Sequence, residues 1–195
     1  MPQYFESDPA VASDRRTVRL ALPDATFDLV TDTGVFARDG VDPGTKLLLL
    51  EAPAPAPDGH LLDVGCGYGP IALTLARRSP AATVWAVDVN ARARELTAEN
   101  AATAGLANVR VAAPDEVPAD VRFRTIWSNP PIRVGKQALH ELLLHWLGRL
   151  DDGGTAVLVV QKHLGADSLA RWLTEQGRAV ERLRSRMAYR LLEVR

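Results

Sequence analysis

The sequence predicts an α/β protein with a mostly parallel sheet and helices on both of its faces, and three observations lead to this fold class. Short apolar runs typical of buried strands alternate with amphipathic helical patterns from residue 61 onward. Glycines stand where helices should end, at Gly105 and Gly177, and Pro70 suits a first helical turn. The length of 195 residues is enough for one domain with a complete hydrophobic core.

An N-terminal extension, residues 1–57, precedes this alternation. Residues 17–22 and 26–31 alternate apolar and polar side chains on either side of a Pro-Asp turn, which is typical of a β-hairpin. A short apolar helix at 46–51 follows, and the repeat APAPAP then predicts a stiff, extended connector. A hairpin and one helix are too small to be stable alone, so we expect the extension to pack on the rest of the chain.

The main domain, residues 58–195, carries the regular β/α pattern. Strands are expected at 61–64, 83–88, 109–112, 124–128 and 155–161. Helices are expected at 70–78, 92–104, 136–150 and 166–176. Two further strand-like runs, at about 179–184 and 188–194, predict an antiparallel hairpin that closes the sheet at its edge.

The composition limits the classes of partner. A single cysteine, Cys66, excludes a disulfide framework and a cysteine-rich zinc cluster. No segment approaches the roughly 18 apolar residues of a membrane span, and the first residues do not resemble a signal peptide. We therefore expect a cytoplasmic protein with no metal and no membrane partner. The net charge of −1 argues against a strong overall field for nucleic acid, but a local basic patch remains available in the arginine-rich tail.

A glycine-rich loop, LLDVGCGYGP, follows the first strand of the main domain. Gly65, Gly67 and Gly69 allow the backbone to turn sharply and to approach a ligand closely, although a tight turn without a ligand is the alternative. Pro70 stands where the dinucleotide-binding fingerprint requires glycine or alanine, so no pyrophosphate cradle is evident. Asp88, which ends the second strand, can accept hydrogen bonds from two ribose hydroxyls. A nucleoside with a cationic amino acid in place of phosphates, such as S-adenosylmethionine, fits this combination.

Two further acids belong to this hypothesis. Asp63 lies two residues before Gly65 and is either close to the methionyl ammonium or a buried carboxylate that caps the loop. Asp115, in the loop after the third strand, is placed to reach an adenine amino group, with Glu116 as its competitor.

The fourth strand ends in the turn Ser128-Asn129-Pro130-Pro131. Two prolines restrict the residue before them and lack N–H donors, so we expect Asn129 to be extended at the strand end. The amide oxygen of Asn129 and the carbonyl of Pro130 would then be free to accept both hydrogens of an exocyclic amine and to orient its lone pair. A purely structural turn is the alternative.

These motifs resemble a known family. LLDVGCGYGP, VDVN and SNPPIR are similar to the first, second and fourth motifs of the class I S-adenosylmethionine-dependent methyltransferases. YFESDPA, TVRLAL, TDTGVFARDGVDPGTKLLL, KHLGADSLARWL and YRLLEVR resemble the small-domain members related to the 16S ribosomal RNA guanine-N2 methyltransferases. The resemblance implies a Rossmann-like fold with a seven-stranded, mostly parallel sheet and a last antiparallel strand.

The resemblance also implies roles for individual residues. Residues implied to contact the cofactor are Asp63, Gly65, Cys66, Gly67, Gly69, Asp88, Val89, Asn90, Asp115 and Asn129, with Gly34, Val35 and Phe36 as a lid. Asn129, Pro130 and Pro131 would face the target amine as the catalytic group, and Ile132, Arg133 and Lys136 would contact the substrate. Ile132 departs from the family pattern, because many amine-directed relatives have an aromatic residue there.

The expected reaction is methyl transfer from S-adenosylmethionine to an exocyclic amine, with guanine N2 of ribosomal RNA, free or in a ribosomal subunit, as the leading target. A protein glutamine or small-molecule N-methyltransferase is the enzymatic alternative. A nucleoside-binding module with an inactive site is the non-enzymatic one. We expect a monomer or a homodimer.

Overall fold

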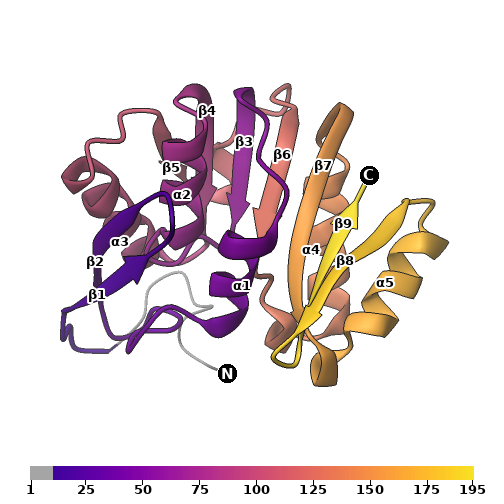
Figure 1. The fold of residues 1–195 in the computed structure, drawn as a ribbon, viewed down its shortest axis with the longest axis horizontal. Coiled ribbons are helices and arrows are strands. Elements are labelled where there is room, and N and C mark those ends of the chain that lie inside the picture. Colours follow the sequence, from indigo (N-terminus) through magenta and orange to yellow (C-terminus); the bar gives the residue numbers. More distant parts are fainter. Residues whose placement is uncertain (1–10) are drawn as a thin grey trace.

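The computed structural model describes residues 11–195, so the YFESDPA motif, residues 4–10, lies outside the described part. A seven-stranded sheet forms the centre, in the order β5-β4-β3-β6-β7-β9-β8 (Figure 1). Its strands are β3 (Asp58–Val64), β4 (Ala81–Val87), β5 (Val109–Ala112), β6 (Phe123–Ser128), β7 (Leu150–Gln161), β8 (Val180–Arg186) and β9 (Tyr189–Val194). Only β9 runs against its neighbours β7 and β8, as the pairing within the described sheet shows. The predicted fold class is confirmed.

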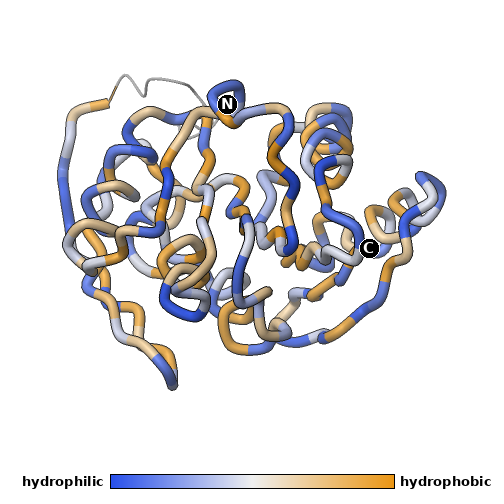
Figure 2. The backbone as a smooth tube through the Cα atoms, turned by 90° about the horizontal axis from the view of Figure 1, so that it is seen from above, coloured by the Kyte–Doolittle hydropathy of each residue, from blue (hydrophilic) through white to orange (hydrophobic). Residues whose placement is uncertain are grey.

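Helices cover both faces of the sheet. α1 (Pro43–Glu51), α2 (Pro70–Arg78) and α3 (Ala91–Thr103) pack on one face, and α4 (Lys136–Leu147) and α5 (Ala166–Glu175) on the other. Neighbouring strand residues point into opposite cores: Leu61 belongs to the first core and Leu62 to the second. Viewed from above, the helices carry both hydrophobic and hydrophilic residues, as expected for helices that cover a sheet (Figure 2).

The boundary between α4 and β7 differs from the prediction. The helix was expected to reach residue 150, but it ends at Leu147, where the N–H of Gly148 bonds to the carbonyl of Leu144. β7 begins at Leu150 and continues through Gly153, whose φ of +75° accompanies an irregular pairing with β6. The apolar periodicity continues to Leu150, so it predicted a longer helix, whereas the helix ends where Gly148 caps it. Within residues 11–195, no helix combines the length and apolar character needed to cross a bilayer.

The N-terminal hairpin consists of β1 (Arg16–Ala21) and β2 (Thr26–Thr31), which form a separate two-stranded sheet beside α3 (Figure 1). Buried Asn100 of α3 joins this hairpin to the main domain. Its amide oxygen accepts from the N–H of Val30 at 2.8 Å, and its Nδ2 donates to the carbonyls of Val30 and Tyr68 at 2.9 and 2.8 Å. The Asn100 side chain therefore gives the backbone of Val30 in β2 the two hydrogen bonds that a neighbouring strand would otherwise provide. It also links Val30 to Tyr68 in the glycine-rich loop.

The connector after α1 is also tied to the sheet. The N–H of Ala56 donates to Thr125 Oγ1 at 3.0 Å, and the carbonyl of Ala56 accepts from Ser79 Oγ at 2.7 Å. Arg78 binds both carboxylate oxygens of Asp24 in the hairpin turn and the carbonyl of Leu49 at the end of α1. Residues 16–57 thus share a core and polar contacts with the main domain. The division at residue 57 stays a prediction.

Replacing Asn100 tests how the hairpin is attached. We expect Asn100→Ala to lower the free energy of unfolding by about 2 kcal/mol, because it leaves buried backbone groups of Val30 and Tyr68 without partners. Urea denaturation measures this difference. Glu95→Ala, at an exposed position of the same helix, is the matched control and should change the stability by no more than about 0.5 kcal/mol. Equal stabilities of the two variants would contradict this role.

Candidate active site

A cavity of about 260 Å³ opens at the carboxyl ends of β3, β4, β6 and β7. Strand order reverses between β3 and β6, and in parallel sheets such a switch point is where ligands bind. The predicted site residues that line the cavity are Val35, Phe36, Gly65, Gly67, Asp88, Val89, Asn90, Asn129, Pro130, Pro131, Ile132 and Arg133. Asp63, Gly69, Asp115, Lys136, Gly34 and Cys66 do not line it, although Cys66 lines a smaller adjoining hollow.

The glycine-rich loop turns directly after β3. The N–H groups of Gly65 and Cys66 both donate to the carbonyl of Val87 at 2.8 and 3.0 Å, which holds the loop against the end of β4. Gly65 has a φ of +76°, and a Cβ built on it would meet no atom within 4 Å. The loop therefore requires glycine for its conformation and leaves space beside it on the cavity side.

Asp88 and Asn90 follow β4 at the cavity wall. The Asp88 carboxylate accepts from the N–H of Gly67 and the N–H of Asn90, both at 2.9 Å. Burial raises the pKa of Asp88, and these two hydrogen bonds oppose the increase. Each carboxylate oxygen has a second lone pair, so Asp88 can still accept hydrogen bonds from a ligand.

Asp63 is fully buried behind the loop. One oxygen accepts from the N–H of Ala72 at 3.0 Å, in the first turn of α2, and the other has no hydrogen-bond partner among residues 11–195. Burial raises the pKa of Asp63 well above its usual range, and the nearby Asp88 charge adds to this effect. The contact with Ala72 matches the alternative of a carboxylate that caps the loop, and contact with a methionyl ammonium stays a prediction.

Cys66, Gly69 and Asp115 lie near the same loops. Burial and the charges of Asp88 and Asp63 raise the pKa of the Cys66 thiol, so it is a poor nucleophile. Gly69 precedes α2 with a φ of +97°, and a Cβ there would come within 2.8 Å of the Leu73 side chain. Asp115 lies in a short 3-10 helix, Pro114–Glu116, whose Pro114 lines the cavity.

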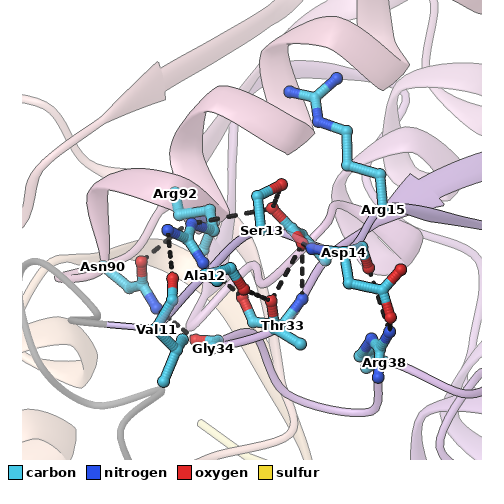
Figure 3. A network of polar contacts seen from close by, with 12 residues as sticks. Val11, Ala12, Ser13, Asp14, Arg15, Thr33, Gly34, Arg38, Asn90 and Arg92 are labelled. Atoms are coloured by element: carbon cyan, nitrogen blue, oxygen red, sulfur yellow. Dashed lines mark hydrogen bonds and ion pairs between the residues drawn. The ribbon is translucent and has the colours of Figure 1, made fainter.

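The predicted lid, Gly34 to Phe36, is anchored by a polar network (Figure 3). Asn90 donates to the carbonyl of Gly34 at 2.8 Å. Arg92 donates to the carbonyls of Thr33 and Val11 at 2.9 and 3.0 Å. Buried Asp32 accepts from Ser13 Oγ and the N–H of Asp14 (2.7 and 2.6 Å). Val35 and Phe36 line the cavity next to these anchors, and Phe36 is 43% exposed.

Asn129 follows β6, and its side-chain amide is held by two residues at the start of α1. Its Nδ2 donates to Asp42 Oδ1 at 2.9 Å and to Thr45 Oγ1 at 3.0 Å. Both amide hydrogens are therefore used, and the amide oxygen remains as the acceptor. The Pro130 carbonyl, expected to be free, accepts one hydrogen bond from the N–H of Ile132 at 2.8 Å and retains one lone pair. Pro131, with φ −75° and ψ 76°, forms the centre of this inverse γ-turn.

Several residues of the cavity were not predicted from the sequence. Beyond Asn129, its walls include Asp42 before α1, Leu142 and Trp146 of α4, Gln161, Leu164 and Tyr189. The available signal was the Asp-Pro-Gly-Thr turn, since aspartate before proline is typical of a helix start. Tyr189 and Gln161 gave no signal, because only the pairing of β7 with β9 brings them together.

The basic residues near the cavity fall into two groups. Arg133 lines it, and neither Arg133, Lys136 nor Lys162 has a carboxylate within 4.0 Å in the described part of the chain. The arginines of the tail are largely paired: Arg182 and Arg190 with Asp167, and Arg184 and Arg186 with Glu51. Among the described residues, the positive charge without a carboxylate partner thus comes from Arg133 and Lys136 after β6 and Lys162 after β7, rather than from the paired arginines of the tail.

The residues fit a nucleoside cofactor. The Asp88 carboxylate, the open side of Gly65, and the exposed side chains of Val89 and Phe36 provide an acceptor, space and apolar contacts for a ribose and a base. No group of three or more His, Cys, Asp or Glu residues is arranged for a metal among residues 11–195.

Comparisons with known proteins identify the family of this chain. The methyltransferase small domain family matches residues 26–193. YbxB of Bacillus subtilis, described as uncharacterized, is 35% identical over 195 residues, which cover 98% of this chain and 97% of YbxB. Ribosomal RNA small subunit methyltransferase C of Pseudomonas putida is 36% identical over 149 residues, 74% of this chain and 45% of that enzyme.

A solved structure gives the same result. The T. thermophilus 16S rRNA N2 G1207 methyltransferase, RsmC, in complex with AdoMet and guanosine, superimposes with a TM-score of 0.78 at 25% identity. The alignment covers 95% of this chain and 52% of RsmC, so the chain spans about half the length of these ribosomal RNA relatives. The resemblance inferred from the motifs is confirmed: the chain belongs to the methyltransferase small domain family of S-adenosylmethionine-dependent methyltransferases.

Proposed function

We propose that this protein methylates the exocyclic N2 amine of a guanine in ribosomal RNA, with S-adenosylmethionine as the methyl donor. The observation that carries the proposal is the amide of Asn129, whose two hydrogens are bound by Asp42 and Thr45 so that its oxygen is left to accept from an amine. Two relatives support this target: T. thermophilus RsmC is a 16S rRNA N2 G1207 methyltransferase with guanosine in its structure, and the Pseudomonas putida relative is a ribosomal RNA small subunit methyltransferase. A ribosomal RNA substrate also implies a cytoplasmic setting.

The cofactor half of the cavity comprises the glycine-rich loop, Asp88 and the lid. Asp88 would accept from the ribose hydroxyls, and Gly65 and Gly67 would allow the methionyl part to lie against the backbone. Val89 and Phe36 would cover the adenine. When bound, the cofactor supplies an electrophilic methyl group on a sulfonium.

The acceptor half would hold the amine in one orientation. The amide oxygen of Asn129 and the remaining lone pair of the Pro130 carbonyl would accept the two amine hydrogens, which directs the amine lone pair away from both oxygens. Neither acceptor is a strong base, so these residues contribute orientation rather than removal of a proton before attack. The apolar side chains of Ile132, Leu142, Trp146 and Leu164 would contact a flat base, which supports an aromatic acceptor even without an aromatic residue after the prolines.

The cofactor assignment predicts a loss of affinity in Asp88→Asn. We expect the dissociation constant for S-adenosylhomocysteine to rise at least about 10-fold, because a charged acceptor is replaced by a neutral one. Isothermal titration calorimetry measures this change. Asp152→Asn, at the exposed opposite end of β7, is the matched control and should bind like the wild type. Equal affinities for the two variants would reject the assignment of Asp88.

The catalytic assignment predicts that Asn129→Ala keeps cofactor affinity but loses methyl transfer. We expect kcat to fall about 100-fold or more, because one of the two acceptors that orient the amine is removed. Transfer of labelled methyl groups to ribosomal subunits from a strain that lacks the enzyme measures kcat. Wild-type activity of Asn129→Ala would contradict its role.

The same assay decides the substrate. We expect the label in N2-methylguanosine after digestion of the ribosomal RNA to nucleosides. Label in glutamine residues of a protein, or in a small molecule but not in RNA, would instead support the alternative N-methyltransferase activities.

A further inference from the structure

The start of α1 is in direct contact with the side-chain amide of Asn129. Asp42 caps this helix by accepting from the N–H of Thr45 at 2.9 Å, and the same oxygen accepts from Asn129 Nδ2. Thr45 Oγ1 provides the second contact at 3.0 Å. The two partners lie 87 and 84 residues before Asn129 in the sequence, so only the packing of α1 against the sheet brings them there.

The chemistry of these partners decides which way the amide points. An ionised carboxylate only accepts hydrogen bonds, so an amide oxygen turned toward Asp42 would meet a second acceptor with no hydrogen between them. The amide nitrogen must therefore face Asp42, and the amide oxygen must face away from it. A neutral partner that could both donate and accept would allow either orientation.

Tyr189 and Gly44 hold Asp42 in turn. A Cβ built on Gly44 would lie 2.5 Å from Tyr189 Cε1 and 2.9 Å from Asp42 Oδ1, so the absence of a side chain lets the ring lie against the helix start. Burial, the charge of Asp42 and its hydrogen bond all raise the pKa of Tyr189. The ring of Tyr189 lines the cavity beside Asp42.

We propose that Asp42 is a positioning residue that sets the orientation of the Asn129 amide, with Thr45 as the acceptor of its second hydrogen, so that the amide oxygen and not the NH2 group meets the amine of the acceptor. This inference rests on the proposed function for its effect on catalysis. With the opposite orientation, the NH2 group would face the hydrogens of the acceptor amine and would repel them. The orientation itself follows from the contacts and is testable without a substrate.

The experiment compares Asp42→Asn, Thr45→Val and Thr45→Ser in the full chain. Asparagine caps helices as well as aspartate does, so Asp42→Asn should leave the fold intact while it removes the acceptor-only partner. We expect kcat with ribosomal subunits to fall about 10- to 100-fold in Asp42→Asn and Thr45→Val. The dissociation constant for S-adenosylhomocysteine should stay within about 2-fold of the wild-type value. Thr45→Ser keeps the hydroxyl and should restore most of the activity.

A second measurement reports on Asn129 directly. The side-chain NH2 resonances of Asn129, assigned with Asn129→Ala in a 15N-labelled protein, should exchange slowly with water in the wild type and in Thr45→Ser. They should exchange at least about 10-fold faster in Thr45→Val, which removes the acceptor of one hydrogen, and in Asp42→Asn, in which the Asn129 amide is no longer held in one orientation. Unchanged exchange and unchanged kcat in these two variants would overturn the inference. If the wild type methylates no guanine, the proposed function fails, and the exchange measurement still decides the positioning role.

Discussion

The arrangement of the site depends on one constraint: both faces of a parallel sheet must be covered, and the strand ends must meet at one edge. β3 lies between β4 and β6, so the glycine-rich loop, Asp88 and Asn129 come together although 64 residues separate the first from the last. The helices that cover the sheet bring further groups to that edge, because each packed helix begins or ends beside it. The packing of the core therefore also determines where the residues of the candidate site lie.

The N-terminal segment illustrates this dependence. α1 buries Leu47, Leu48 and Leu49 in the same core as α2 and α3, which stabilises the fold by removing apolar surface from water. The same packing puts Asp42 and Thr45 under the Asn129 amide. The hairpin and the polar network that includes Arg92 and Thr33 (Figure 3) hold the other half of the segment. There, Val35 and Phe36 line the side of the cavity that we propose for the cofactor. A stretch that resembles an appendage therefore contributes to both halves of the site.

The two proposed halves of the cavity, for the cofactor and for the acceptor, carry charges of opposite sign. Asp88 lies on the side proposed for a cationic cofactor, with Asp63 enclosed behind the loop. Arg133, which has no carboxylate within 4.0 Å among residues 11–195, lies on the side proposed for the acceptor. The tail arginines pair with Glu51 and Asp167, which reduces the positive charge that the tail leaves available. The near-zero net charge is therefore an average over local fields of opposite sign, and an RNA substrate would be recognised by the rim of one cavity rather than by the whole surface.

Several features could be predicted from the sequence alone: the order of the elements, the glycine-rich loop, Asp88 and the Asn129-Pro130-Pro131 turn. These features are local: apolar periodicity, positive φ and the rigidity of proline act over a few neighbouring residues. Other features depend on the three-dimensional packing: Asp63 is enclosed behind its loop, the Pro130 carbonyl accepts from the N–H of Ile132, and Tyr189 and Asp42 meet at the cavity. Contacts of this second kind depend on which helix covers which strand and on the pairing of β7 with β9, and no short stretch of sequence carries that information.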